Sequence, residues 1–522
     1  MRIILLFTLS GWLWSVSLFS QITVPAPLKQ DFAGTMGFLS SGWMQGREAG
    51  SRESFMAADY LLSQMMQLGL QPGNGAGYFQ DFDIVRYQSS VSSLRITTSD
   101  GKSLTESSFV SGRDFVVDAG PQDFSVRASM VFSGHGIVAP EAGIDDYHKL
   151  NVAGSVVVVL DGFPYLKKAS VADPASIAPV VDESLFSLKS RRNHAFSRGA
   201  KALIVICSDK KLAEYNAESG SQVAEYPAFT TSSSPFPAYT DHFWALPDDQ
   251  TDLPVYYISQ RLAALILGAD HPVFAESEKT GDIRKNHSHG KISNREIQLS
   301  ATYQTERLSG RNVLGLIRGT DTSRCVVIGA HYDHLGQRNG LVYHGSDDNA
   351  SGVAGMLALA AAWKRAGVQP PVNLLFAAWA GEEKGHLGSR YFTGNHDYRH
   401  TGILLNLNFD MISRSDEADT TRNILSIGML QGSNDLRQMA MMENSRLNRP
   451  FKLDLWETMG GGGSDYAAFS LRKIPVMSFF TGFHQDYHSP GDTFAKADLE
   501  KMEAVLQLAN RLLVAYLSLI IR

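Results

Sequence analysis

The chain has 522 residues, of which 44% are hydrophobic and 19% are charged, and it exceeds the size that one hydrophobic core usually organises. Its formal net charge of -6 and pI near 6.2 lack the basic surplus with which a nucleic-acid-binding protein neutralises phosphates. We therefore expect two folded units and exclude nucleic acid as a partner.

Residues 1–20 have the plan of a secretory signal peptide. An arginine at position 2 precedes an apolar run from Ile3 to Phe19, and a serine follows the run. The run has about 17 apolar residues, the lower limit of a membrane-spanning length, so an uncleaved anchor is the alternative. We expect cleavage near Gln21, export to the periplasm or the cell exterior, and no stable membrane association after cleavage.

Cys207 and Cys325 are the only two cysteines, and both lie inside apolar runs typical of buried strands. We expect no disulfide bond between them. An exported chain without disulfides suits a bacterial periplasm or exterior better than a small disulfide-stapled scaffold.

Three segments of the mature chain differ in the spacing of their apolar residues and therefore in their expected secondary structure. Residues 53–70 have apolar side chains at helical spacing and end at a glycine, which predicts a helix, and a strand is expected near 78–87. Between 96 and 295, short runs such as SVVVVLDG and ALIVIC are separated by Gly, Pro and Ser clusters, which predicts a mainly β unit with a few helices. From residue 312 onward, strands and helices alternate, which predicts an α/β fold with a mixed, largely parallel sheet flanked by helices.

Polar candidates cluster at the ends of the apolar runs in the α/β part. His331, Glu383 and Asp410 each stand at or just after the end of such a run. In parallel sheets, ligands bind at the carboxyl ends of the strands. Asp410 lies in the apolar stretch LLNLNFDMI, where an unpaired charge would be costly, so a cation is its expected partner.

Each candidate also has an ordinary interpretation. A histidine at a strand end is more often a polar loop residue than a zinc ligand, and Asp333, two residues after His331, is a candidate to orient its ring. The acids of SDDNAS at 346–351 resemble helix-capping residues. Glu382 and Glu383 form an acidic pair, which is usually solvated, but here the pair ends a buried strand. Adjacent carboxylates point in different directions, so one can bind metal while the other faces a water molecule.

The loop FHQDYHSPGDT, residues 483–493, adds Tyr487 and His488 after another apolar strand. His and Tyr clusters in loops often only cap turns. The preceding loop MGGGGSDYAAF, residues 459–469, offers a flexible backbone that could approach a substrate, although four glycines in a row are also typical of a linker.

The motifs AHYDHLG, SDDNASG, AGEE, NFDMI and DYHSPGDT, in this order, resemble the di-zinc aminopeptidase and glutamate carboxypeptidase group, the twenty-eighth metallopeptidase family of clan MH. The resemblance covers roughly residues 30–95 and 296–522. It implies a zinc exopeptidase fold, peptide substrates and two Zn²⁺ ions per chain. It thus assigns residues 21–95 and 296–522 to one catalytic domain.

The resemblance also implies roles for individual residues. Asp348 would bridge both metals, with His331 and Asp410 completing one zinc site. Glu383 and His488 would complete the other. Glu382 matches the general base, and Tyr487 matches a position that helps to stabilise the reacting carbonyl oxygen. The carboxylates of Asp348, Glu383 and Asp410 would neutralise most of the charge of two Zn²⁺ ions in a partly buried site.

Residues 96–295 resemble an inserted protease-associated domain, most clearly in the segments 133–164 and 198–209. Such domains border the catalytic site and restrict or bind substrate. None of the candidate ligands lies in this insert, so we expect it to affect substrate choice more than bond breaking. One departure from many relatives is Tyr466, which stands where they have a histidine after Ser-Asp, and this affects the lining of the pocket.

Three alternatives remain beside the aminopeptidase. The same metal site serves carboxypeptidases and dipeptidases, where the charge of the pocket decides. Glutaminyl cyclases use a similar fold with a single zinc. Non-catalytic receptor ectodomains of this fold have lost metal ligands, whereas all five stand here together with Glu382.

Overall fold

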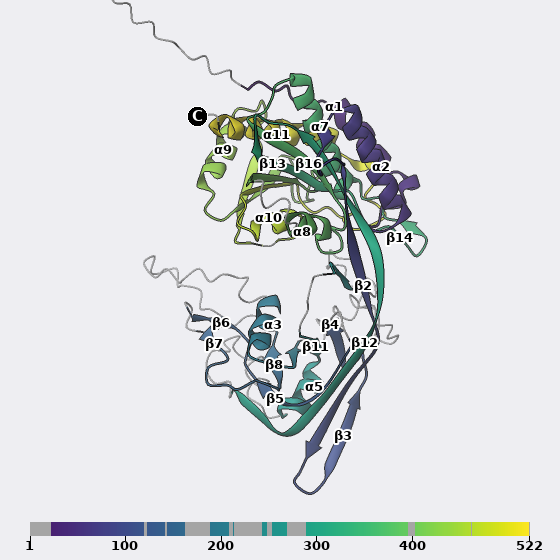
Figure 1. The fold of residues 1–522 in the computed structure, drawn as a ribbon, viewed down its shortest axis with the longest axis vertical. Helices are drawn as coiled ribbons and strands as arrows, with labels where there is room; N and C mark the ends of the chain where they lie inside the picture. Colours follow the sequence, from purple (N-terminus) through teal and green to yellow (C-terminus); the bar gives the residue numbers. More distant parts are fainter. Residues whose placement is uncertain are drawn as a thin grey trace, which may run out of the picture.

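The structure is a computed structural model that describes residues 22–118, 123–140, 144–161, 188–207, 212, 243–247, 253–268, 289–394, 402–460 and 462–520. The expected signal peptide, residues 1–20, lies outside this range. Two long antiparallel strands, β2 (Phe79–Ser99) and β12 (Gly290–Ile317), run as a ribbon between two lobes (Figure 1). We call residues 22–78 and 312–520 the main lobe, and the described residues between 100 and 289 the inserted lobe.

One sheet organises the main lobe. Its strand order is β19-β18-β20-β17-β13-β16-β12, and the central neighbours β20, β17, β13 and β16 are parallel. The strand β12 is antiparallel to β16, and β18 is antiparallel to β20 but parallel to β19. The expected mixed, largely parallel sheet is thereby confirmed. The strands are β13 (Asp321–His331), β16 (Val372–Trp379), β17 (Gly402–Phe409), β18 (Ile424–Leu430), β19 (Lys452–Thr458) and β20 (Val476–Phe480).

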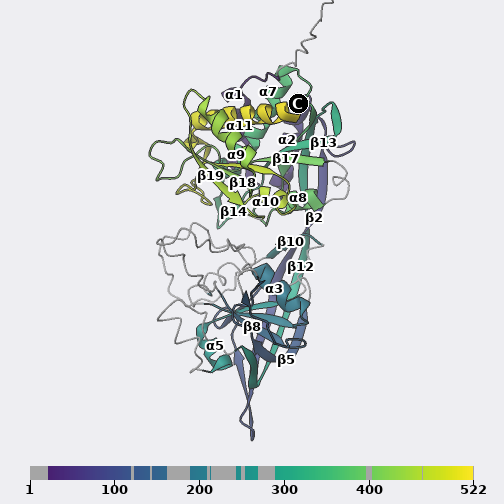
Figure 2. The same ribbon diagram turned by 90° about the vertical axis from the view of Figure 1, so that its left-hand side faces the viewer.

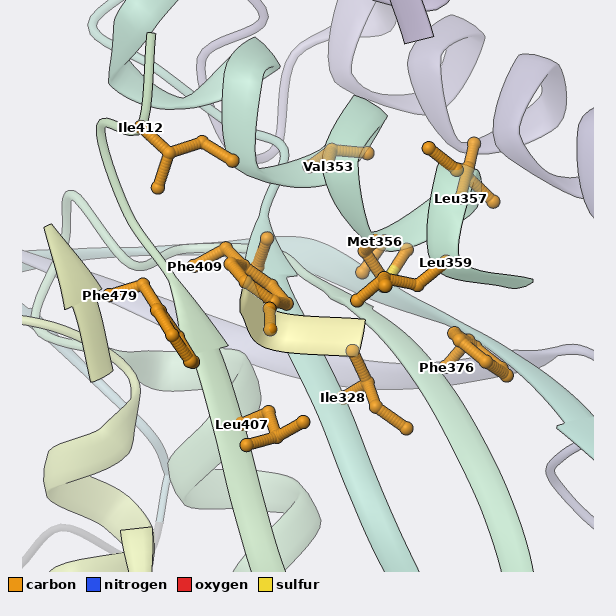
Figure 3. Close-up of a cluster of buried hydrophobic side chains, with 14 of the residues drawn as sticks. Ile328, Val353, Met356, Leu357, Leu359, Phe376, Leu407, Phe409, Ile412 and Phe479 are labelled. Carbon is orange, nitrogen blue, oxygen red and sulfur yellow. The ribbon is translucent and has the colours of Figure 1, made fainter. Parts of the chain in front are cut away.

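Side chains of the central strands alternate between two hydrophobic cores. On β13, Val326 and Ile328 enter one core, whereas Val327 enters the core on the opposite face. Figure 3 shows the first core, in which Ile328 and Phe409 of the sheet lie opposite Met356 of the helix above. Because both faces are covered, these strands read in the sequence as continuous apolar runs rather than as alternating ones.

Helices cover both faces of the sheet, with α1, α2, α7, α9 and α11 on the first core and α10 on the second, while α8 contributes Leu387 to the first core and Phe392 to the second. Of the helices in the described residues, only α11 is long and apolar enough to span a membrane, and it packs into the first core through residues such as Leu506 and Leu513. The bounds are α1 (Lys29–Leu39), α2 (Arg52–Gln67), α7 (Gly352–Ala366), α8 (Leu387–Gly394), α9 (Asn434–Ser445), α10 (Tyr466–Ser470) and α11 (Leu499–Ile520).

The helix expected over residues 53–70 is α2. Its first turn is capped by the Ser51 side chain, which accepts a hydrogen bond from the Ser54 backbone N–H at 3.1 Å. It ends two residues before Gly69, whose φ of 70° favours glycine. The strand expected near 78–87 is the first part of β2, which continues to Ser99.

The inserted lobe extends the same sheet in the order β12-β5-β8-β9-β11-β4. The strands β5, β8, β9 and β11 are parallel to one another, whereas β5 is antiparallel to β12 and β11 is antiparallel to β4. Positions 95 and 296, where the sequence suggests domain boundaries, lie within β2 and β12. Cys207 in this lobe and Cys325 in the main lobe are buried and not joined by a disulfide bond, as expected. The elements are β3 (Leu104–Phe109), β4 (Phe115–Asp118), β5 (Phe124–Phe132), β8 (Val156–Leu160), α3 (Leu188–Ser197), β9 (Ala202–Ile206), β11 (Val255–Ile258) and α5 (Gln260–Leu267).

Short elements complete the two lobes. The strand β10 (Phe243–Ala245) pairs with β2 at the neck between the lobes (Figure 2). The others are η1 (Gly42–Met44), β1 (Gln71–Pro72), β6 (Val138–Ala139), β7 (Ile144–Asp145), β14 (Gln337–Arg338), β15 (Leu341–Val342), η4 (Ser346–Ser351) and η6 (Phe494–Lys496).

Candidate metal centre

The candidate ligands come from the carboxyl ends of four adjacent strands. His331 is the last residue of β13, and Asp410 directly follows β17. Glu383 lies in the turn after β16, and His488 lies in the loop after β20. Because these strands are parallel neighbours, all four side chains meet at one edge of the sheet.

Asp348 is presented by the irregular turn η4, just before α7. The capping role goes to its neighbour Asn349, whose Oδ1 accepts the Gly352 N–H at 2.9 Å. The turn is held from behind by Asp492, whose carboxylate accepts the backbone N–H groups of Asp347 and Asp348 at 3.0 Å. The side chain of Asp348 is therefore left to face the other ligands.

The first ligand group consists of His331, Asp348 and Asp410. The His331 Nε2 atom lies 3.4 Å from Asp348 Oδ1 and 3.4 Å from Asp410 Oδ1. A tetrahedral zinc ion with bonds of about 2.0–2.1 Å separates its ligand atoms by about 3.3 Å. The His331 Nδ1 atom faces the backbone carbonyl of Asp333 at 3.2 Å, which can only accept, so Nδ1 carries the proton and Nε2 offers its lone pair to the group.

The second ligand group consists of His488, Asp348 and Glu383. The His488 Nε2 atom lies 3.0 Å from Asp348 Oδ2 and 3.2 Å from Glu383 Oε2. Asp348 therefore turns one oxygen toward each group, as a bridging carboxylate must. These donors, nitrogen and carboxylate oxygen in two neighbouring sets, fit two zinc ions.

The carboxylates of the acidic pair after β16, Glu382 and Glu383, point in different directions. Glu383 Oε1 lies 2.7 Å from His334 Nδ1, and Oε2 faces His488, so this carboxylate belongs to the second group. Glu382 points the other way, with Oε2 3.8 Å from His331 Nε2 and Oε1 3.2 Å from His386 Nε2. Its side chain is 10% exposed and lies beside the first group.

Charge in the centre is unbalanced without a cation. Burial raises the pKa of Glu382 well above its usual value, and the Glu383 and Asp410 carboxylates raise it further. Burial lowers the pKa of His488, but Glu383 and Asp348 outweigh this and raise it to about 10. The four carboxylates of the centre, Asp348, Glu382, Glu383 and Asp410, repel one another unless protons or neighbouring imidazolium groups balance their charge. Bound metal ions would supply that positive charge instead.

Asp333 lies behind His331 as expected, but its contact with the ring differs from the expectation. The ring faces the backbone carbonyl of Asp333, while the carboxylate Oδ1 is 3.9 Å away and instead accepts the Glu382 N–H at 3.2 Å. Because Asp333 is only two residues after His331, its main chain rather than its side chain faces the ring. Asp333 thus connects the His331 strand with the Glu382 turn.

Three further titratable residues belong to the centre and were not singled out from the sequence. His334, which is fully buried, contacts Glu383, and His386 contacts Glu382. Asp465 is also fully buried, and burial raises its pKa to about 7. The spacing of His334 within AHYDHLG was the available signal, since three residues past a strand end can return to the same edge.

Tyr487 and Tyr466 lie at the side of the centre. The Tyr487 ring stacks on the His488 ring, with centroids 3.8 Å apart, and it also contacts Phe483. Tyr466 packs against Trp456, with centroids 5.6 Å apart, and its hydroxyl lies against Gly462 of the glycine loop. The tyrosine at position 466 therefore packs against the loop.

A parallel α/β sheet that brings two ligand sets sharing Asp348 to its carboxyl edge is suited to hold metal ions. Residues 312–513 match the model of Peptidase family M28.

Known proteins resemble the chain at two levels. It is 30% identical over 184 residues to leupeptin-inactivating enzyme 1 of Streptomyces exfoliatus, covering 35% of this chain and 38% of that protein. It is 28% identical over 209 residues to leucine aminopeptidase 2 of Trichophyton equinum, covering 35% and 40%. The matches thus span about two fifths of these relatives' length. The fold resembles the solved aminopeptidase from Aneurinibacillus sp. strain AM-1 over 94% of this chain and 93% of that one, with a TM-score of 0.53 and 19% identity.

Proposed function

We propose that the chain is an exported zinc-dependent exopeptidase that acts as an aminopeptidase on peptides. The observation that carries the proposal is the spacing of the ligand atoms in two groups that share Asp348, from 3.0 to 3.4 Å for the ring-nitrogen contacts. That spacing suits two zinc ions, held by His331, Asp348, Glu383, Asp410 and His488.

Zinc held by these residues would polarise a carbonyl oxygen and make water more acidic. Glu382 takes the proton of the attacking water and gives it to the leaving amine. Burial raises the pKa of its carboxyl group above the usual value of a glutamate, which strengthens it as a proton acceptor. Tyr487, fixed by its stack on His488, helps to stabilise the reacting carbonyl oxygen.

The charges around the centre favour an aminopeptidase over a carboxypeptidase. A carboxypeptidase needs a cation for the substrate's terminal carboxylate, but two cations beside the ligand turns, Arg47 and Lys384, are engaged elsewhere. Arg47 is buried and donates to the carbonyls of Tyr332, His344 and Gly345, among others, and Lys384 donates to Glu48 at 2.7 Å. Glu382 and Asp465 are buried carboxyl groups of the centre outside the proposed ligand set, and they suit a substrate ammonium group.

Two segments outside the metal centre have their own proposed roles. Residues 1–20 act as the export signal, and residues 96–295 form a protease-associated domain next to the catalytic domain. The inserted lobe lies beside the carboxyl edge of the main sheet, where the ligands meet, which suits a role in substrate access (Figure 1).

Metal stoichiometry and a substrate panel test the proposal together. The mature chain should bind about two zinc ions and release N-terminal residues from amino-acid 4-nitroanilides and free peptides. Blocking the substrate's amino group by acetylation should abolish hydrolysis. Full activity with one zinc ion, together with cyclisation of N-terminal glutamine, would support the cyclase instead. Cleavage of acetylated dipeptides from the carboxyl end would support a carboxypeptidase.

A further inference from the structure

Trp244 of the inserted lobe contacts the turn that carries Glu382 and Glu383. Trp244 lies in β10, which pairs with β2 so that Trp244 faces Arg86 across the ladder. The Lys384 Nζ atom lies 3.7 Å from the centroid of the Trp244 ring. Lys384 directly follows Glu382 and Glu383 in the sequence. Trp244 and Leu246 also pack against the hydrophobic core of the main lobe.

Lys384 also connects the turn to Glu48 in the main lobe. Its side chain is 6% exposed, and the ammonium donates to Glu48 Oε1 at 2.7 Å. Glu48 in turn lies against Gly336, in the loop that follows His331 and His334. The Lys384 ammonium is therefore held between a carboxylate of the main lobe and an aromatic face of the inserted segment.

Glycines flank the turn at both ends. Gly381 and Gly385 stand on either side of the three residues from Glu382 to Lys384, and their φ angles are 75° and 98°. A methyl group added at Gly385 would meet no atom within 4 Å, whereas one at Gly381 would lie 3.2 Å from Leu387 Cβ. Backbone hydrogen bonds, such as that from the Gly385 N–H to the Glu382 carbonyl, hold the turn together, and the Asp333 contact to the Glu382 N–H and the Lys384 contact to Glu48 anchor it to other parts of the chain.

We propose that Trp244 is a positioning residue for the hydrolysis, because it holds Lys384 and thereby the turn on which Glu382 and Glu383 are placed. The inserted lobe then affects kcat as well as substrate choice. This inference rests on the proposed aminopeptidase function. It assigns no contact between Trp244 and substrate.

The expected size of the effect follows from the two contacts. A cation held over a tryptophan face contributes modestly, and small displacements of a catalytic group reduce turnover steeply. Trp244→Ala should lower kcat roughly tenfold on a single amino-acid 4-nitroanilide, with KM within about twofold and zinc content unchanged. Trp244→Phe keeps an aromatic face and should restore most of kcat.

A double-variant cycle tests the proposed path. Lys384→Met, which breaks the contact from the other side, should lower kcat by a similar factor, and the pair of substitutions should cause no further loss. Phe196→Ala removes a half-exposed aromatic ring from α3 of the inserted lobe and should leave kcat unchanged. Additive losses, or a Trp244→Ala effect confined to KM or to long peptides, would overturn the proposal.

Hydrogen exchange of the turn separates this inference from the proposed function. Amides 382–387 should exchange faster in Trp244→Ala than in wild type, and Trp244→Phe should protect them again. If the wild-type protein hydrolyses no anilide but the exchange changes as stated, the proposed function fails while the positioning contact stands. If wild type is active and exchange of the turn is unchanged in Trp244→Ala, the contact does not position the turn.

Discussion

Replacing each member of the acidic pair separately gives the sharpest test of the mechanism. The two residues share residue type, turn and burial, with side chains 10% and 5% exposed for Glu382 and Glu383, so each variant is the matched control of the other. Glu382 Oε2 stands 3.8 Å from His331 Nε2, farther than the 3.4 Å that separates His331 from Asp348 and Asp410 in the first group. Glu383 instead contacts His334 and His488, at 2.7 and 3.2 Å.

These contacts lead to different losses. Glu382→Ala should keep the fold and the zinc content but lose about 10² to 10⁴ in single-turnover rate, which corresponds to about 3–5 kcal/mol of barrier. Glu383→Ala removes a ligand atom and leaves the buried His334 imidazole without its carboxylate partner. It should lose zinc as well as activity, and excess zinc should restore activity only in part.

Zinc content after dialysis and single-turnover rates on an amino-acid 4-nitroanilide measure both variants. Glu382→Gln, which keeps the shape but has no ionisable carboxyl group, should behave like Glu382→Ala. Near-normal turnover in either Glu382 variant would remove the general base from the mechanism. Unchanged zinc content in Glu383→Ala would remove Glu383 from the ligand set.

Three further predictions concern stability and metal. Chelation of zinc should lower the melting temperature, because a ligand that binds only the folded state stabilises that state. Calorimetry with and without zinc measures this change. Gly352→Ala would press a methyl group onto Asn349 Oδ1 and the Phe409 carbonyl, so it should reduce zinc affinity as measured by competition with a chromophoric chelator. Asp419→Asn leaves Lys501 without its charged partner at 3.3 Å in a buried site and should destabilise the fold by about 3 kcal/mol in urea unfolding. Burial raises the pKa of Asp419, but hydrogen bonds from Ile424 and Thr421 outweigh this and lower it to about 2. Its contribution is therefore present above about pH 4 and lost as the pH falls towards 2, so wild type and Asp419→Asn should converge in stability at acid pH.

The sequence predicted the central sheet well because its signal is local. Most of β13, β16 and β17 is buried on both faces, so each strand is a mainly apolar run, and a polar residue at its end is conspicuous. His331, Glu383 and Asp410 were found in this way, and the parallel arrangement brings them together. The role of Asn349 as the cap, which leaves Asp348 free for metal, depends on contacts with Phe409 and Met411 that no local pattern contains.

The extent of the ribbon and the partners of the ligands could not be predicted in the same way. The strand expected near 78–87 continues to Ser99 because β12 supplies a hydrogen-bonding partner along the whole length, although the segment from 88 to 93 is polar and rich in serine. The approach of Trp244 to Lys384 joins residues 140 positions apart in the chain and follows from where β10 pairs with that ribbon.

His334 shows how tertiary structure decides between a loop histidine and a functional one. Its position three residues after His331 allows a return to the same edge of the sheet, but a solvated loop with the same spacing is equally compatible with the sequence. In the fold its side chain is fully buried, its Nδ1 atom contacts Glu383, and its ring meets the His488 ring edge-on. Burial lowers its pKa and opposes a second proton, so the neutral ring donates from Nδ1 to the Glu383 carboxylate. A neutral donor at this place orients the ligand without adding positive charge that would repel zinc, which is the property that a partner of a metal-binding carboxylate requires.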